Sequence, residues 1–469
     1  MTFKKRAVTS AAVLCCGLGI IGDATAAPKQ NAAPARDRIN WADFMSRQDP
    51  VWTEIPREWH EGPFVGNGLH GTMIWAEKDE PLHWDVGRSD VTDRSYRLPI
   101  GKFVLRPQGT VTGGTFRLDL WNAEARGTLR TDRGQISTRT FTHATLPVTI
   151  VEREGTQAEQ GAGLEFVQTP PLPARETFRN EPIPPDRINP AATVGESDTV
   201  RWCRQPFKAG GGYTVAWSEK PGTDGKKLLA FTVDFAKDGD APNPDKAVGI
   251  VRSALRDGTD ALAKSHRAWW HAYWPQSFVS IPDTRMENFY WIQMYKMAAA
   301  TRADKPALDL MGPWFRSTPW PRIWWNLNIQ LTYWPVYTAN RLELGESLTR
   351  MIDTNRQNLI NNVPEEWRGD SAAVGRTSSY DAVGKVGDER GNLLWTLHNY
   401  WLQYRYSGDE KMLRNGLYPI LTRSVGYYLH LLEPGDDGRL HLPLSTSPEY
   451  PDKAPDTNYD LSLLRWGLT

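Results

Sequence analysis

The chain has 469 residues, which is long enough for two or three domains with large hydrophobic cores. Lysine plus arginine and aspartate plus glutamate number 55 each, so the formal net charge is zero, which argues against nucleic acid or an acidic membrane surface as a partner. The 21 tryptophans suit a protein that holds neutral polar ligands.

The first 26 residues have the pattern of a secretory signal peptide. Basic residues 4–6 precede an apolar run over residues 7–21, and Ala-Thr-Ala at 24–26 forms a cleavage site. The apolar run is short for a membrane span. We therefore expect a periplasmic or secreted protein that is cleaved before Ala27, with a flexible leader over residues 27–40.

In residues 41–243, apolar and polar residues alternate with the two-residue period that is typical of β-strands. Phe116, Leu118 and Leu120 alternate with polar residues, and the run from Leu229 to Phe235 repeats the pattern. Many strands without intervening helices predict an antiparallel β-sandwich. A proline-rich stretch over residues 170–190 predicts a long loop, either functional or mobile.

The hydrophobic period changes after about residue 244. Leu262, His266, Trp269 and Tyr273 fall on one helical stripe, which predicts a linking helix within residues 244–282. Residues 283–469 are mostly helical by pattern, with helices expected at about 340–361, 389–406 and 419–432. Pairs of helices joined by long loops predict a toroid or barrel of helices.

The segment from Trp320 to Trp334 stands out because it sets two asparagines, Asn326 and Asn328, among aromatic rings. Rings cover the apolar faces of a sugar and amides exchange hydrogen bonds with its hydroxyls. Residues two apart share a side only in an extended chain, so we expect an extended stretch followed closely by a helix that Pro335 kinks or restarts. An aromatic core element whose amides cap a helix is the alternative.

A second candidate is Ser447-Pro448-Glu449. Pro448 biases the preceding residue away from helix, so Glu449 should lie on a loop. A loop carboxylate near aromatic rings can have its pKa raised by desolvation and serve as a general acid. The alternative is a solvated loop glutamate.

The remaining polar residues give weaker signals. Trp59 and His60 flank a glycine turn and could reach the mouth of the barrel, and His398 lies mid-helix. For each of the three, the sequence favours a structural role over a functional one. The nine histidines are scattered without metal-ligand spacing, and no phosphate- or dinucleotide-binding glycine pattern occurs. We therefore expect no metal and no organic cofactor.

Four motifs in this order resemble glycoside hydrolase family 95, whose known members are α-L-fucosidases and α-L-galactosidases. They are Gly66-Asn67-Gly68 with Gly71, Asn326-Leu327-Asn328 followed by Tyr333-Trp334-Pro335, the helix around His398, and Ser447-Pro448-Glu449.

The resemblance implies an N-terminal antiparallel β-sandwich over 41–243, a linker helix over 244–282 and an (α/α)6 barrel over 283–469. It implies inverting hydrolysis in which Glu449 is the general acid. Asn326 and Asn328 then hold the attacking water with help from an aspartate. Further candidate contacts with the sugar are Trp324, Trp325, Trp334, His398, Trp59 and His60.

Two departures from the family pattern matter. The assisting aspartate lies well beyond the Ser-Pro-Glu element in the family, whereas Thr469 is only 20 residues after Glu449. Asp456 and Asp460 are the nearby substitutes, and we interpret both as loop or cap residues. We therefore expect an incomplete barrel, a truncated chain or fragment, with an unidentified base. Trp324 also occupies the position where fucosidases of the family usually carry a histidine. The resemblance therefore supports a glycoside as the substrate more strongly than it supports fucose as its sugar.

The leading hypothesis is an exported inverting exo-glycosidase that removes a terminal α-linked L-fucose or L-galactose from a glycan. The alternatives are a non-catalytic carbohydrate-binding protein, an inactive fragment, or a related glycoside phosphorylase. The sequence determines neither the linkage nor the oligomeric state.

Overall fold

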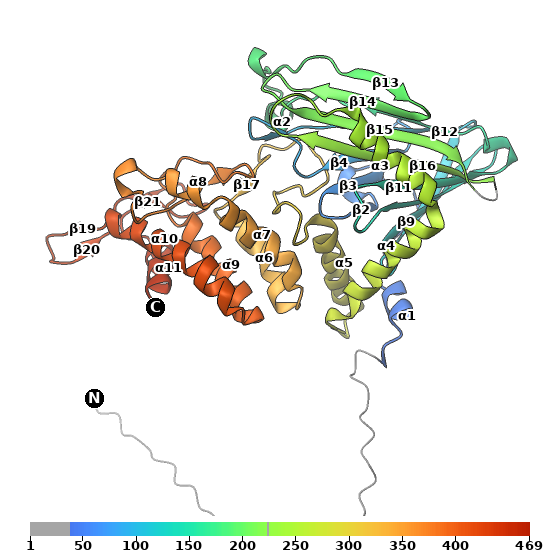
Figure 1. The fold of residues 1–469 in the computed structure, drawn as a ribbon. Helices are drawn as coiled ribbons and strands as arrows, with labels where there is room; N and C mark the ends of the chain where they lie inside the picture. The colour runs from blue at the N-terminus through green and yellow to red at the C-terminus, as the bar shows by residue number, and fades with distance from the viewer. Residues whose placement is uncertain (1–37, 223–224) are drawn as a thin grey trace, which may run out of the picture. The chain divides into compact units, whose positions relative to one another are not determined.

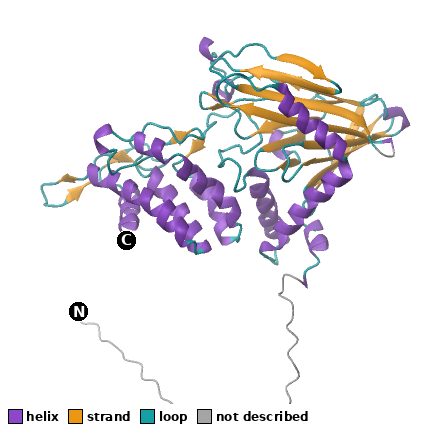
Figure 2. Ribbon diagram, in the orientation of Figure 1, coloured by secondary structure: helices purple, strands orange, loops and turns teal. Residues whose placement is uncertain are grey.

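The computed structural model describes residues 38–222 and 225–469, and residues 40–469 form one compact unit. The predicted signal peptide and nearly all of the predicted leader lie outside the described residues. Apart from the short helices α1 (Trp41–Ser46) and α2 (Ala174–Arg179), the first part of this unit is built of strands and the second mostly of helices, as Figures 1 and 2 show.

Two antiparallel sheets form the strand-rich part. The first has nine strands in the order β1-β8-β9-β10-β11-β16-β15-β14-β13, and the second has five in the order β12-β7-β4-β3-β2. The nine strands are β1 (Val51–Trp52), β8 (Val111–Asp119), β9 (Glu124–Thr131), β10 (Gln135–Thr142), β11 (Thr149–Gly155), β13 (Thr193–Ser197), β14 (Val200–Pro206), β15 (Gly212–Pro221) and β16 (Lys227–Ala236). The five are β2 (Phe64–Gly66), β3 (His70–Trp75), β4 (His83–Arg88), β7 (Gly101–Arg106) and β12 (Gly163–Gln168).

The sheets face each other across a buried core. Trp84 of β4 is fully buried and its indole N–H donates to the Thr140 hydroxyl of β10 at 2.8 Å. Phe103 of β7 lies 4.7 Å from Phe231 of β16, measured between ring centroids. The alternation noted in the sequence is observed in β8, where Phe116 and Leu118 are buried and Arg117 between them is exposed.

The segment expected to hold one linking helix contains two. Helix α3 (Pro244–Asp257) and helix α4 (Thr259–Tyr273) are separated by Gly258, whose φ of 79° is a left-handed value that favours glycine. The apolar face of α3 packs on β14, β15 and β16, which explains its strong amphipathic pattern.

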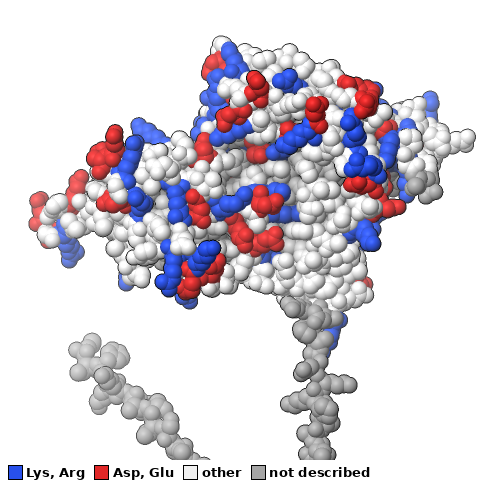
Figure 3. Space-filling model, viewed as in Figure 1, with Lys and Arg blue, Asp and Glu red and all other residues white. Residues whose placement is uncertain are grey.

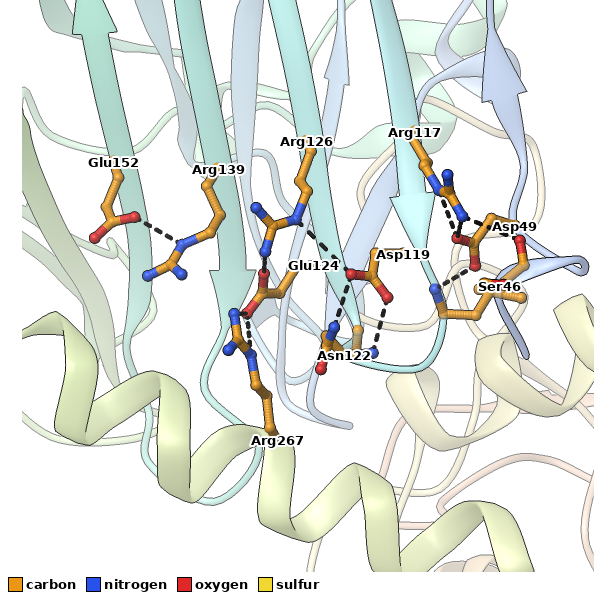
Figure 4. Close-up of polar contacts among 12 residues, drawn as sticks. Ser46, Asp49, Arg117, Asp119, Asn122, Glu124, Arg126, Arg139, Glu152 and Arg267 are labelled. Atoms are coloured by element: carbon orange, nitrogen blue, oxygen red, sulfur yellow. Dashed lines mark hydrogen bonds and ion pairs between the residues drawn. The ribbon is translucent and has the colours of Figure 1, made fainter. Parts of the chain in front are cut away.

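Helix α4 is fastened to the large sheet by charge (Figure 4). Glu124 of β9 is fully buried and pairs with Arg267 of α4 at 2.6 Å and with Arg126 of its own strand. Such a buried carboxylate needs both partners, because a lone buried charge would be costly.

Helices follow from residue 284 onward. They are α5 (Thr284–Ala300), α6 (Asn328–Thr338), α7 (Leu342–Thr354), α8 (Arg356–Asn361), α9 (Asn392–Ser407), α10 (Tyr418–Leu431) and α11 (Asn458–Leu468). Helix α9 contacts α6, α7, α10 and α11, so it is central to this group. Two expectations are corrected: the helix at 340–361 is divided near Asn355, and the helix expected from Glu389 begins at Asn392.

Gly71 of the first motif and Gly87 of β4 allow the segment after α5 to approach the small sheet closely. A Cβ at Gly87 would lie 2.1 Å from the carbonyl oxygen of Pro313, and one at Gly71 would lie 2.9 Å from the Pro313 ring. Neither position tolerates a side chain without movement of the backbone opposite.

A buried ion pair fixes the loop between α5 and the Asn326 segment. Arg97 donates to Asp309 at 2.6 Å, and each side chain is 1% exposed. Asp309 also accepts from the backbone N–H groups of Met311 and Gly312 at 2.9 and 2.8 Å. The loop that leads to the candidate site is therefore anchored to the sandwich.

Candidate active site

The Asn326 segment is extended only at its start. Strand β17 (Ile323–Trp324) pairs with β18 (Thr377–Ser378), a turn follows, and α6 begins at Asn328. Asn326 lies in that turn and is 2% exposed, whereas Asn328 is half-buried. The expected extended stretch thus ends two residues before the first asparagine. Pro335 lies inside α6.

Trp325 holds this turn against the segment that carries β18. Its indole N–H donates to the Ser378 hydroxyl at 2.8 Å, and its backbone N–H donates to the carbonyl of Arg376 at 2.9 Å. The side chain is 2% exposed. We therefore assign Trp325 to the buried core next to Asn326, where its hydrogen bonds fix the turn.

Glu389 lies beside Asn326 and was missed as a site residue in the sequence. It is 4% exposed, and Arg376 pairs with its Oε1 at 2.5 Å. Burial raises the pKa of Glu389, while Arg376 and a hydrogen bond from the Asn326 side chain lower it. In the sequence, Asp388 and Glu389 precede an apolar run, a pattern that is typical of the start of a helix. Glu389 was therefore interpreted as a helix-start residue and not as a site residue.

Glu449 lies at the tip of a small hairpin next to this carboxylate. Strands β21 (Ser445–Thr446) and β22 (Lys453–Ala454) form the hairpin, which is fastened by a backbone hydrogen bond from Thr446 to the Asp388 carbonyl at 3.0 Å. The negative charge of Glu449 contributes to raising the pKa of Glu389, after the larger effect of burial.

Glu449 is on a loop, as predicted, but the expected desolvation is not observed. The residue is exposed, with a φ of 65° in the turn. Its position at the tip of a hairpin keeps its carboxylate in solvent. The buried carboxylate of the site is Glu389 instead.

Several buried polar atoms in this region have no hydrogen-bond partner. They include Asn326 Oδ1, Glu389 Oε2, Asn392 Oδ1 and the hydroxyl of Tyr459. The charge of Glu389 also contributes to raising the pKa of Tyr459, after burial and Asp460. Unpaired buried polar atoms are costly, and a cluster of them is typical of a functional site.

The two aspartates considered as substitutes for the missing base are fully engaged. Asp460 is fully buried and accepts from Ser445 and Tyr428 at 2.6 Å each, and from Thr457 at 2.8 Å. Asp456 pairs with His441 at 2.5 Å and caps a backbone N–H. Both bonding patterns fit the loop and cap roles predicted for them.

Aromatic side chains border the Asn326 turn. Trp324 is half-buried, and its ring lies 6.5 Å from that of Trp320, which is 52% exposed. From the sandwich, Trp59 is half-buried with Arg316 over its ring at 5.7 Å, and His60 is exposed. Both lie in the short 3-10 turn Trp59–Glu61.

Trp334 and His398 have other surroundings. Trp334 is 42% exposed and lines an apolar groove of about 680 Å³ between α5 and α6, with Phe289 among the lining residues. His398 packs between Trp401 and Trp466, at ring distances of 5.3 and 5.1 Å, and burial lowers its pKa. This packing matches the structural alternative considered for His398.

The described residues contain no group of three or more histidines, cysteines or acidic residues arranged to hold a metal ion. Within the same ranges, each helix is too short or too polar to cross a bilayer. Positive and negative side chains are interspersed on the face shown in Figure 3.

The described residues thus form a two-sheet β-sandwich followed by a group of packed helices. A putative kojibiose phosphorylase from the human microbiome has the same fold, with a TM-score of 0.61 at 10% sequence identity, over 86% of this chain and 60% of that one. The predicted fold class is therefore confirmed.

Sequence comparison supports the family resemblance. Residues 280–462 match the family model for the glycosyl hydrolase family 95 catalytic domain, and this range contains Asn326, Asn328, Glu389 and Glu449. The resemblance predicted from the motifs is thus confirmed over residues 280–462. Alpha-L-fucosidase 2 of Arabidopsis thaliana is 29% identical over 195 residues, which cover 38% of this chain and 23% of that protein. The chain therefore matches only about a quarter of the length of this relative.

Proposed function

We propose that the chain belongs to an exported inverting exo-glycosidase that removes a terminal α-linked L-sugar, with L-fucose as the first substrate to test. The family match and the name of the Arabidopsis relative support the substrate class. The observation that carries the proposal is the match of residues 280–462 to the family 95 catalytic domain, a range that contains Asn326, Asn328 and Glu449.

The roles follow from exposure and chemistry. Glu449 is exposed, so its carboxyl group can reach the oxygen of a leaving sugar and protonate it. Asn326 and Asn328 carry amide oxygens that can accept a hydrogen bond from a water molecule. Inversion needs acid and water-activating groups roughly 6.5 to 9.5 Å apart, so that a water fits between the sugar and the second group.

The aromatic border suits the sugar itself. The rings of Trp320 and Trp324 can cover its apolar face. Trp324 is a larger and less polar group than the histidine that fucosidases usually carry there, so L-galactose is the alternative sugar. We also propose export through the N-terminal signal; mass spectrometry of the mature protein tests it, and a first residue other than Ala27 contradicts the cleavage site.

The test compares aryl α-L-fucosides, aryl α-L-galactosides and fucosylated glycans as substrates of the wild-type chain, Glu449→Gln and the control Glu433→Gln. Glu433 is an exposed glutamate of a neighbouring hairpin. Loss of a general acid should lower kcat by about 10²- to 10⁴-fold on glycans. The loss should be smaller on aryl glycosides, whose leaving groups need less protonation. Equal activity of Glu449→Gln and wild type would remove Glu449 from the mechanism.

Two further readouts separate the alternatives. Proton NMR of the first product identifies its anomer, and a retained configuration contradicts inversion. Turnover that requires inorganic phosphate and releases a sugar phosphate identifies a phosphorylase. Sugar binding in calorimetry without any turnover identifies a carbohydrate-binding protein, which would fit the engagement of Asp456 and Asp460 in structural contacts.

A further inference from the structure

Asp388, an exposed residue shortly before α9, contacts both strands of the hairpin that carries Glu449. Thr446 of β21 and Lys453 of β22 are register partners and form the last pair before the tip. The backbone N–H of Thr446 donates to the carbonyl of Asp388 at 3.0 Å, and the Lys453 ammonium group pairs with the Asp388 carboxylate at 2.6 Å. The tip of the hairpin therefore begins at two residues that are both fastened to Asp388.

The tip is a tight turn with a strained backbone. The N–H of Tyr450 donates to the carbonyl of Ser447 at 3.1 Å, which closes a four-residue turn with Pro448 and Glu449 at its centre. Glu449 has a φ of 65°, a left-handed value for which glycine or asparagine is favoured at this position of a type II turn. A residue in such a conformation persists only when its surroundings hold it. The placement of the Glu449 side chain therefore depends on how firmly the two strands are held.

The residue after Asp388 is linked to the asparagine turn. Glu389 pairs through Oε1 with Arg376 at 2.5 Å, and the carbonyl of Arg376 accepts a hydrogen bond from the backbone N–H of Trp325 at 2.9 Å. Trp325 directly precedes Asn326. These two consecutive acidic residues therefore connect the hairpin on one side to the asparagine turn on the other.

We propose that Asp388 is a positioning residue that fixes Glu449 relative to the asparagine turn by binding both strands of the hairpin. The inference rests on the proposed function for the role of Glu449 as general acid. Without the Asp388 side chain, Lys453 loses its partner and the tip is free to move, so the Glu449 carboxyl group is less often placed to protonate the leaving oxygen. The hydrogen bond from Lys453 lowers the pKa of Asp388, which keeps its carboxylate charged at neutral pH.

The chain offers a matched control in the ion pair of Glu165 and Arg106. This pair joins β12 to β7, two strands that carry no candidate site residue, at a distance of 2.8 Å. Its side chains are 59% and 51% exposed, compared with 49% for Asp388 and 51% for Lys453. Exposed ion pairs contribute little to global stability. Asp388→Ala and Glu165→Ala should therefore change Tm by similar small amounts, and a difference in activity between them reports on the site.

The first experiment measures kcat, KM and Tm of Asp388→Ala and Glu165→Ala on a fucosylated glycan and on an aryl α-L-fucoside. A misplaced acid should lower kcat of Asp388→Ala on the glycan by about 10- to 100-fold, with KM changed less than about 3-fold. On the aryl fucoside the loss should be less than about 3-fold, because its leaving group needs little protonation. Equal losses on the two substrates, or a glycan loss no larger than that of Glu165→Ala, overturn the proposal.

A double variant separates one shared contact from two independent effects. If Asp388 and Lys453 act through their ion pair, Asp388→Ala combined with Lys453→Ala should lose no more activity on the glycan than the more impaired single variant. Losses that multiply across the two positions overturn the proposal.

The anchor can also be measured if no sugar is hydrolysed, an outcome that would refute the proposed function alone. Hydrogen exchange of residues 445–454, followed by mass spectrometry, reports on the amides of Thr446 and Tyr450, whose hydrogen bonds fasten the hairpin and close its turn. These amides should exchange at least about 3-fold faster in Asp388→Ala than in wild type, and at the wild-type rate in Glu165→Ala. An unchanged rate in Asp388→Ala overturns the inference, since the hairpin then does not depend on this residue.

Discussion

Asp309→Ala should destabilise the protein strongly, because it breaks the ion pair that anchors the loop before Asn326. The substitution leaves Arg97 buried without its carboxylate and frees the backbone N–H groups of Met311 and Gly312. Removing one partner of a buried pair costs about 3 to 5 kcal/mol. The 430 residues from Asn40 to Thr469 have an unfolding entropy of about 0.9 kcal/mol/K. Dividing the loss of unfolding free energy by this entropy gives a Tm that is lower by about 3 to 6 °C.

Thermal unfolding followed by circular dichroism measures this shift. The control is Asp186→Ala, which breaks the exposed pair with Arg94, where the two side chains are 64% and 34% exposed. An exposed pair contributes at most about 1 kcal/mol, so its Tm should fall by about 1 °C or less. Equal Tm shifts for the two variants would refute the reasoning from burial. Replacing Arg97 and Asp309 together by Met and Leu should recover part of the loss, since no charge then remains buried.

Two more predictions concern the sandwich. Gly87→Ala places a Cβ 2.1 Å from the Pro313 carbonyl oxygen, so the free energy of unfolding in urea should fall by about 1 to 3 kcal/mol. The control is Gly163→Ala, where no atom lies within 4 Å, and its free energy of unfolding should fall by less than about 1 kcal/mol. Equal losses in the two variants would contradict the close approach at Gly87. Burial lowers the pKa of His266 to about 3. Below pH 6.5 this histidine therefore binds a proton in the unfolded chain but stays neutral in the folded chain. The free energy of unfolding should then fall by about 1.4 kcal/mol per pH unit as the pH drops. Urea unfolding at pH 6.5, 5.5 and 4.5 should therefore give a shallower decline for His266→Gln; an unchanged slope would contradict a neutral, buried His266.

Local patterns predicted the order of strands and helices but not every boundary. The two-residue alternation at Phe116 and Leu118 and the helical stripe at Leu262 and His266 depend on neighbours in the chain, so they are visible in the sequence. The break at Gly258 was missed because a glycine within a helical pattern does not by itself end a helix. The same holds for the division of the helix near Asn355.

The candidate site was predicted in part. Asn326, Asn328 and Glu449 were found because their motifs are compact, and Asn326 and Glu449 are among the groups that affect the pKa of Glu389. Glu389 itself has no local signature, since an acidic residue ahead of an apolar run is typical of a helix start. Trp325 was predicted to contact the sugar, but the structure buries it. The sequence could not distinguish it, because the neighbouring tryptophans lie in the same aromatic segment and no local pattern shows which of them is buried.

The sequence by itself predicted the class of fold, the resemblance to family 95 and the residue types of the site, because each depends on short-range periodicity or on a motif of three residues. Only the tertiary structure decided which groups meet. Asn326, Glu389 and Glu449 follow one another at intervals of 63 and 60 residues along the chain, and each lies on a separate loop. Burial then sets their chemistry, since it removes water from Glu389 and Asn326 while the hairpin leaves Glu449 in solvent.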